Sequence, residues 1–143
     1  MLVGHSLGST FLLDVLENLK HQVKAAFFIA GFTGLLNNPE FDELNKTFVS
    51  KSFNWTKIKN NCKRFYVINS DNDHYVPLEK GKSLAKNLGS ELIVLKNAGH
   101  INAEAGYTKL DLLFEKIKNE LLYVAASQLQ HFHSGRCTKN QVL

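Results

Sequence analysis

The sequence is poor in the residues that mark fibrous, disulfide-rich and membrane-spanning proteins. Two prolines and nine glycines among 143 residues exclude collagen-like and low-complexity chains. Cys62 and Cys137 lie far apart and form no C-x-x-C pair, so neither a disulfide framework nor a zinc site is predicted. The apolar runs are only a few residues long, which excludes a membrane span of about 20 residues.

These scarcities favour the cytoplasm as the compartment. Two distant cysteines fit a reducing environment. The first residues lack the basic region of a secretory signal, and Asp14 and Glu17 interrupt the apolar positions that follow. We therefore expect a cytoplasmic protein without membrane attachment.

The charge is nearly balanced. Lysine and arginine number 17 against 13 aspartates and glutamates, which gives a net charge of +4. Basic residues alternate with acidic ones, as in Glu79-Lys80 and Glu115-Lys116, so no nucleic-acid partner is predicted. With 44% hydrophobic and 21% charged residues, the chain is expected to form one packed globular domain.

Short apolar runs alternate with helical stripes along the chain. The runs that predict strands are Leu2-Val3, 25–30, 65–68 and 92–95. Spacings of three and four residues predict helices over 9–20, 77–88 and 110–124, whereas 32–61 is irregular apart from a weak helical segment at 55–58. This alternation predicts an α/β fold with about four parallel strands and helices on both faces.

The pattern ends near Ser127. We expect a domain over residues 1–126 and a disordered polar tail over 127–143. The tail contains His131 and His133, which are expected to be solvated rather than to hold a metal.

Parallel sheets collect functional groups in the loops at the carboxyl ends of their strands, here after Val3, Ile68 and Leu95. The first loop reads Gly4-His5-Ser6-Leu7-Gly8, a G-x-S-x-G pattern between a strand and a helix. Such a turn exposes a serine hydroxyl, and the flanking glycines avoid collisions. The N–H of Leu7 would then lie at a helix N-terminus and stabilise an oxyanion. The alternative is a glycine-rich turn with an incidental serine.

The other two loops supply an acid and a histidine. Asp71 and Asp73 follow the third strand, where either could orient an imidazole or merely serve the turn. His100 follows the last strand and could act as general base on Ser6. The order serine, acid, histidine is the one that α/β-hydrolases use. The three loops together predict a serine hydrolase.

The sequence resembles the α/β-hydrolase superfamily, and within it the small serine hydrolases related to retinoblastoma-binding protein nine. The resemblance covers about residues 1 to 125 and rests on segments 3–8, 53–62, 73–77 and 98–100. It implies Ser6 as nucleophile, Asp73 (the aspartate of D-x-x-[VL]-P) as orienting acid and His100 as base, with no metal or cofactor. It also implies that the segment around Trp55 packs near the site as a minimal cap. A tryptophan-anchored core helix is equally compatible with that segment.

The sequence departs from this family at its start. Only Met1 to Val3 precede the serine turn, where the family has about another half-domain with further strands and a loop that gives the second oxyanion donor. We therefore expect a partial fold that lacks the N-terminal strands and leaves the nucleophile strand at an edge.

Two functions follow from this. The first is hydrolysis of a small ester, thioester or amide through an acyl-serine intermediate. The alternative is a catalytically impaired hydrolase that acts, if at all, by binding a protein. The glycine spacing does not fit a nucleotide-binding G-x-G-x-x-G loop.

Overall fold

The computed structural model describes the backbone of residues 1–134 and the side chains of residues 1–123. The chain divides into two compact units, of which the first is Met1–Thr108 and the second begins at Lys109. The domain boundary expected at residue 126 stays a prediction. All three loops singled out from the sequence belong to the first unit.

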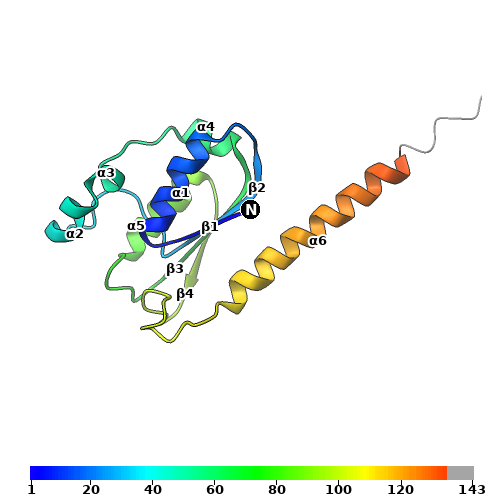
Figure 1. Cartoon of the computed structure of the whole chain (residues 1–143). Coiled ribbons are helices and arrows are strands. Elements are labelled where there is room, and N and C mark those ends of the chain that lie inside the picture. The colour runs from blue at the N-terminus through cyan, green and yellow to red at the C-terminus, as the bar shows by residue number, and fades with distance from the viewer. Residues whose placement is uncertain (135–143) are drawn as a thin grey trace, which may run out of the picture. The chain divides into compact units, whose positions relative to one another are not determined.

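Four parallel strands form one sheet in the first unit (Figure 1). Their order in the sheet is their order in the chain, β1-β2-β3-β4, so β1 lies at one edge. The bounds are β1 Leu2–His5, β2 Val23–Ile29, β3 Cys62–Ser70 and β4 Leu92–Leu95. The expected four-stranded parallel sheet is confirmed. The three loops follow the carboxyl ends of its strands and therefore lie at the same end of the sheet.

The helices of the first unit connect successive strands. Their bounds are α1 Leu7–Asn18, α2 Pro39–Leu44, α3 Lys46–Val49, α4 Trp55–Asn60 and α5 Leu78–Leu88. Helix α1 begins immediately after Ser6, earlier than its apolar stripe indicates. Gly89 ends α5 in the left-handed conformation with φ 71°.

The segment expected to be irregular, residues 32–61, contains three short helices. Asparagine side chains cap the start of two of them. The Asn38 side chain accepts a hydrogen bond from the N–H of Phe41, and Pro39 occupies the first turn of α2. The Asn54 side chain accepts one from the N–H of Lys57 at the start of α4. These are local polar signals, and a search for apolar periodicity does not register them.

The main hydrophobic core joins α1, α4 and α5 to one face of the sheet. It contains Leu13 and Leu16 of α1, Ile58 of α4 and Leu84 of α5, all fully buried, and Phe28 of the sheet lies among them. On the opposite face the buried side chains are Ala25, Phe27, Ile29 and Ile68. The helices expected on that second face stay a prediction.

Helix α6, Asp111–Ser134, belongs to the second unit and continues past the point where the polar tail was expected to begin. The physical reason is that no proline or glycine occurs between Asp111 and Gly135, so nothing in the sequence interrupts a helix there. The rest of the expected tail, and the side chains of His131 and His133, lie outside the described residues. No helix in the described part of the chain combines the length and the hydropathy needed to cross a membrane.

Candidate active site

Ser6 occupies a strained turn between β1 and α1. Its φ of 54° and ψ of −125° are unusual for a residue with a side chain. Two backbone hydrogen bonds fix the turn: Ser6 N–H donates to the Ile29 carbonyl at 2.8 Å, and Ser9 N–H donates to the Ser6 carbonyl at 2.9 Å. The sheet and the helix together therefore hold Ser6 in the conformation expected of a nucleophile turn.

The two glycines of the turn differ in why they are there. A Cβ on Gly4 would lie 2.6 Å from the Gly8 carbonyl oxygen and 2.8 Å from Leu12 Cδ1, so α1 can approach β1 this closely only because Gly4 has no side chain. A Cβ on Gly8 would meet nothing within 4 Å. The expected collision is thus present at Gly4 and absent at Gly8 within the described structure.

Asp73 and His100 are brought together from two loops. His100 Nδ1 lies 2.8 Å from Asp73 Oδ2, and both groups are largely buried. The other carboxylate oxygen, Oδ1, accepts hydrogen bonds from the N–H groups of Tyr75 at 2.9 Å and Val76 at 3.0 Å. The carboxylate is therefore held by backbone on one side and by the imidazole on the other.

These contacts set the protonation of the pair. Burial by itself raises the pKa of Asp73, but the hydrogen bonds from His100, Val76 and Tyr75 outweigh it and leave the pKa below its ordinary value. An ionised carboxylate only accepts hydrogen bonds, so Nδ1 of His100 carries the proton. In the neutral imidazole the lone pair is then on Nε2, the form that a general base needs.

The neighbouring acid has a different task. Asp71 Oδ1 accepts the N–H of Asn97 at 2.8 Å, so this carboxylate serves the loop and not the imidazole. The sequence alone left Asp71 and Asp73 open, and the family resemblance favoured Asp73. The hydrogen bond to His100 agrees with that choice.

Two residues that the sequence analysis did not single out surround His100. His5 Nε2 lies 2.8 Å from the His100 carbonyl oxygen and therefore donates to it, and the two rings are 4.8 Å apart. The Tyr75 ring lies edge-on to His100 at 5.0 Å. Both residues stand in the motifs already described, since His5 directly precedes Ser6 and Tyr75 follows Asp73 by two positions. Neither motif indicates that these side chains contact His100.

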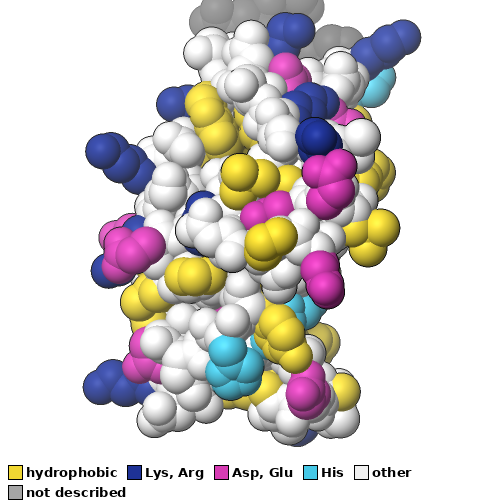
Figure 2. All heavy atoms as spheres, turned by 90° about the vertical axis from the view of Figure 1, so that its left-hand side faces the viewer, with side chains coloured by type: hydrophobic (Ala, Val, Ile, Leu, Met, Phe, Trp, Pro, Cys, Tyr) yellow, Lys and Arg dark blue, Asp and Glu magenta, His cyan; other side chains and the backbone are white. Residues whose placement is uncertain are grey.

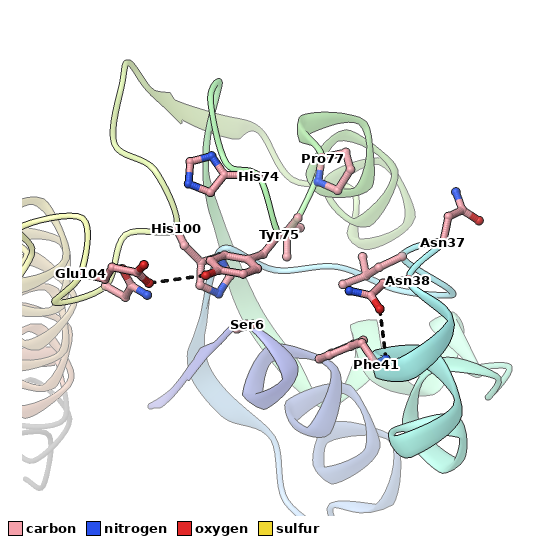
Figure 3. Close-up of a pocket in the computed structure, with 12 residues that line it drawn as sticks. Ser6, Asn37, Asn38, Phe41, His74, Tyr75, Pro77, His100 and Glu104 are labelled. Carbon is pink, nitrogen blue, oxygen red and sulfur yellow. Dashed lines mark hydrogen bonds between the residues drawn. The ribbon is translucent and has the colours of Figure 1, made fainter.

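A pocket of about 500 Å³ opens beside these groups, and Ser6 and His100 both line it (Figure 3). In Figure 3, Ser6 lies at the start of α1 beside the rings of His100 and Tyr75, and Phe41 of α2 faces them. The full lining is Ser6, Leu36, Asn37, Asn38, Phe41, His74, Tyr75, Val76, Pro77, His100, Asn102 and Glu104.

The wall facing the serine thus comes from residues 36–41 and not from the segment around Trp55. Trp55 packs instead against the main core beside Phe53, with ring centroids 5.8 Å apart. Of the two roles that the sequence left open for Trp55, the core helix is the one observed.

The remaining electrostatic features are modest. Leu7 is the first residue of α1, and the N–H groups of a first helical turn have no carbonyl partner within the helix.

On the face seen in Figure 2, basic and acidic side chains are interspersed rather than gathered by sign. Among the described residues, no group of three or more His, Cys, Asp or Glu side chains is arranged to hold a metal. The absence of a cofactor stays a prediction.

Comparison with known proteins extends this picture. YdeN of Bacillus subtilis (strain 168), whose name describes it as a hydrolase, is 32% identical over 116 residues, which are 80% of this chain and 60% of YdeN. The rat serine hydrolase RBBP9 is 27% identical over 100 residues, 70% of this chain and 52% of the relative. The chain thus spans little more than half the length of these two relatives.

The crystal structure of the ydeN gene product from B. subtilis superposes on this chain with a TM-score of 0.76 and 29% identity. The match covers 83% of this chain and 63% of that one, and it confirms the expected α/β-hydrolase fold class. A protein-family model described as serine hydrolase matches residues 1–119, from the strand before Ser6 into α6. The chain belongs to the serine hydrolase family.

Proposed function

We propose that this protein hydrolyses a small ester, thioester or amide through an acyl-serine intermediate, with Ser6 as nucleophile, His100 as base and Asp73 as orienting acid. The observation that carries the proposal is the 2.8 Å contact between His100 Nδ1 and the Asp73 carboxylate, in a pocket that His100 shares with Ser6. Family membership supports the hydrolase class. The roles of Asp73 and His100 rest on this contact, and the role of Ser6 rests on its strained turn and its place in the same pocket.

The first step is acyl transfer to the enzyme. Ser6 Oγ bonds to the substrate carbonyl carbon while His100 Nε2 takes the hydroxyl proton, and the carbonyl electron pair moves onto its oxygen. The N–H of Leu7, at the start of α1, donates to this oxyanion. The carbonyl re-forms, the bond to the leaving group breaks, and His100 gives its proton to that group.

The second step returns the enzyme to its starting state. Water attacks the acyl carbon, His100 takes a proton from the water, and the bond to Ser6 Oγ breaks as His100 returns the proton to the serine. Asp73 stays ionised throughout and stabilises the imidazolium that forms twice in the cycle. No step requires a metal or an organic cofactor.

The test is covalent labelling of the 143-residue chain with a fluorophosphonate probe, read by intact mass and peptide mapping. We expect one adduct, on Ser6, and none in Ser6→Ala. Ser83→Ala is the matched control, since Ser83 is exposed on α5 away from the pocket, and it should label like the unchanged chain. A folded chain without an adduct, or an adduct that persists in Ser6→Ala, would contradict the proposal.

A second candidate function is protein binding by a catalytically impaired hydrolase. The observation that favours it is the position of β1: its hydrogen-bonded neighbour in the described sheet is β2, on one side, and Val3 is 48% exposed. An open strand edge is a template for pairing with another chain. Turnover of an activated ester by the 143-residue chain that disappears in Ser6→Ala would rule this candidate out.

We also propose a cytoplasmic location. The low cysteine content of the sequence supports it, because Cys62 and Cys137 lie far apart and predict no disulfide framework. Cell fractionation checks this against a secreted or membrane-bound pool.

A further inference from the structure

Four consecutive side chains, those of residues 70–73 at the end of β3, accept hydrogen bonds from four consecutive residues after β4. These four lie in residues 97–101, the histidine loop. Each is an acceptor, and the first three accept backbone N–H groups. The bonds run from Ala98 N–H to Ser70 Oγ (3.0 Å), from Asn97 N–H to Asp71 Oδ1 (2.8 Å), from Gly99 N–H to Asn72 Oδ1 (2.8 Å), and from His100 Nδ1–H to Asp73 Oδ2 (2.8 Å).

The first and third of these acceptors are themselves joined. The Ser70 hydroxyl donates to Asn72 Oδ1 at 2.8 Å while its oxygen accepts the N–H of Ala98. Ser70 is fully buried and Ala98 is 1% exposed, so water does not replace this bond if it is lost. Asn72 Oδ1 accepts hydrogen bonds from both the Ser70 hydroxyl and the N–H of Gly99. It therefore links the loop after β3 to the histidine loop.

The histidine loop needs such support because its own backbone is strained. Asn97, Gly99 and Ile101 all have positive φ, at 53°, 53° and 52°. For Ile101, which is β-branched and directly follows His100, this conformation is a steric outlier. A segment in such a conformation persists only where its surroundings impose it.

We propose that Ser70 and Asn72 are positioning residues that fix the backbone of the histidine loop, so that His100 meets Asp73 and keeps Nε2 for Ser6. The inference rests on the proposed function for what the positioning achieves. Neither residue lines the 500 Å³ pocket that Ser6 lines. Asn72 lines a neighbouring cavity of about 330 Å³, which His100 also lines and Ser6 does not. Their removal should lower the rate of the chemical step and leave substrate binding unchanged.

The central comparison is Asn72→Ala with Asn72→Asp. Alanine removes the shared acceptor, whereas aspartate keeps an Oδ1 in the same place. With an activated ester at neutral pH, we expect kcat to fall about 10- to 100-fold in Asn72→Ala with KM within about twofold, since misplacement of a reacting group by about 1 Å has effects of this size. Asn72→Asp should restore kcat to within about threefold of the unchanged chain.

Two further variants complete the set. Ser70→Ala removes the second acceptor and should act in the same direction as Asn72→Ala. Ser90→Ala is the matched control, because the buried Ser90 hydroxyl has no hydrogen-bond partner among the described residues. This variant should leave kcat unchanged. Thermal unfolding of every variant shows whether a loss of rate is only a loss of folded protein.

A second readout does not depend on catalysis. NMR of the ¹⁵N-labelled chain reports the amide exchange of Ala98 and Gly99 and the Nδ1 proton of His100. We expect faster amide exchange in Asn72→Ala, loss of the slowly exchanging Nδ1 proton, and recovery of both in Asn72→Asp.

If the chain neither turns over ester nor reacts with fluorophosphonate, the proposed function fails and these spectra alone decide the positioning role. Spectra of Asn72→Ala that match the unchanged chain overturn the inference. So does an Asn72→Asp variant as impaired as Asn72→Ala, or an effect on KM in place of kcat.

Discussion

Asp73 holds a negative charge at a position from which water is largely excluded. Its side chain has no exposed surface, and burial alone would favour the neutral acid. The hydrogen bonds from His100, Val76 and Tyr75 favour the ionised form more strongly and leave the pKa below 3.8. The residue that is proposed to orient the base is therefore also a source of folding stability that depends on pH.

The sign of that dependence follows from the direction of the pKa. A carboxyl group whose pKa is lower in the folded state stabilises the fold above its ordinary pKa of 3.8, and this contribution disappears as the pH falls through the folded pKa. We expect Asp73→Asn to be less stable than the unchanged chain at pH near 6. The difference should shrink steadily below about pH 4.

Urea unfolding at several pH values between about 2.5 and 6 measures this difference. Asp71→Asn is the control at a neighbouring carboxylate that does not contact His100. A gap between Asp73→Asn and the unchanged chain that is constant, or that widens on acidification, would show that Asp73 is not held ionised by these contacts.

At the scale of elements, the junction of β1 with α1 determines where Ser6 lies. The strand ends at His5 and the helix begins at Leu7, so a single residue carries the whole change of direction. Such a sharp turn brings the first turn of α1 against Gly4, where a Cβ would lie 2.6 Å from the Gly8 carbonyl oxygen. Backbone cannot yield as a flexible side chain can, so the helix itself would have to move.

This predicts opposite outcomes for the two glycines of the motif. Gly4→Ala should destabilise the fold by about 1 to 3 kcal/mol, as overpacking does, and should abolish fluorophosphonate labelling of Ser6. Gly8→Ala should be neutral or stabilising by up to about 1 kcal/mol, because Gly8 is helical, its surroundings are open, and alanine favours helix.

Chemical denaturation and labelling of the two alanine variants side by side check this prediction. Each variant acts as the control for the other, since the change in side chain is the same. Equal losses of stability at both positions would mean that the close approach at Gly4 is not what the motif requires.

At the scale of the whole first unit, two hydrophobic clusters have different tasks. The main core joins α1, α4 and α5 to the sheet and includes Ile58, which is fully buried. A second cluster of Phe32, Val49 and Val76, with Phe41 packed against it, borders the pocket. The first cluster holds the elements together, whereas the second shapes the space in front of Ser6.

Substitutions in the two clusters should therefore separate stability from substrate binding. Ile58→Ala should cost about 2 to 5 kcal/mol and leave KM of the folded protein unchanged, because it removes buried volume from a residue that does not line the pocket. Phe41→Ala should cost less stability, since Phe41 is only half-buried, and should raise KM for esters with apolar acyl groups several-fold.

Denaturant unfolding and steady-state kinetics on both variants measure the two effects. If Ile58→Ala raises KM as much as Phe41→Ala does, then α4 takes part in the pocket after all, as the cap suggested for the segment around Trp55 would.

The strands and the principal helices could be predicted because their signals are local. Residues 92–95 form an uninterrupted apolar run with a strand's length, and β4 has these bounds. Helices α2 and α4 were missed or underestimated, because asparagine caps start them and their apolar stripes are short. Helix α6 was cut short, because the pattern lost its apolar stripe long before it met a residue that stops a helix.

The sequence by itself determined the order of the strands and principal helices and the position of the serine turn, because each depends on residue type and spacing within one short segment. It placed candidate acids after β3 and a candidate histidine after β4, and left the choice between Asp71 and Asp73 open. Only the tertiary structure decided that Asp71 serves a backbone N–H while Asp73 meets the imidazole, that Phe41 rather than Trp55 faces the serine, and that Gly8 has room for a side chain. These outcomes depend on distances between segments far apart in the chain. Such distances are set by how the helices pack on the sheet, and no local pattern of residues encodes them.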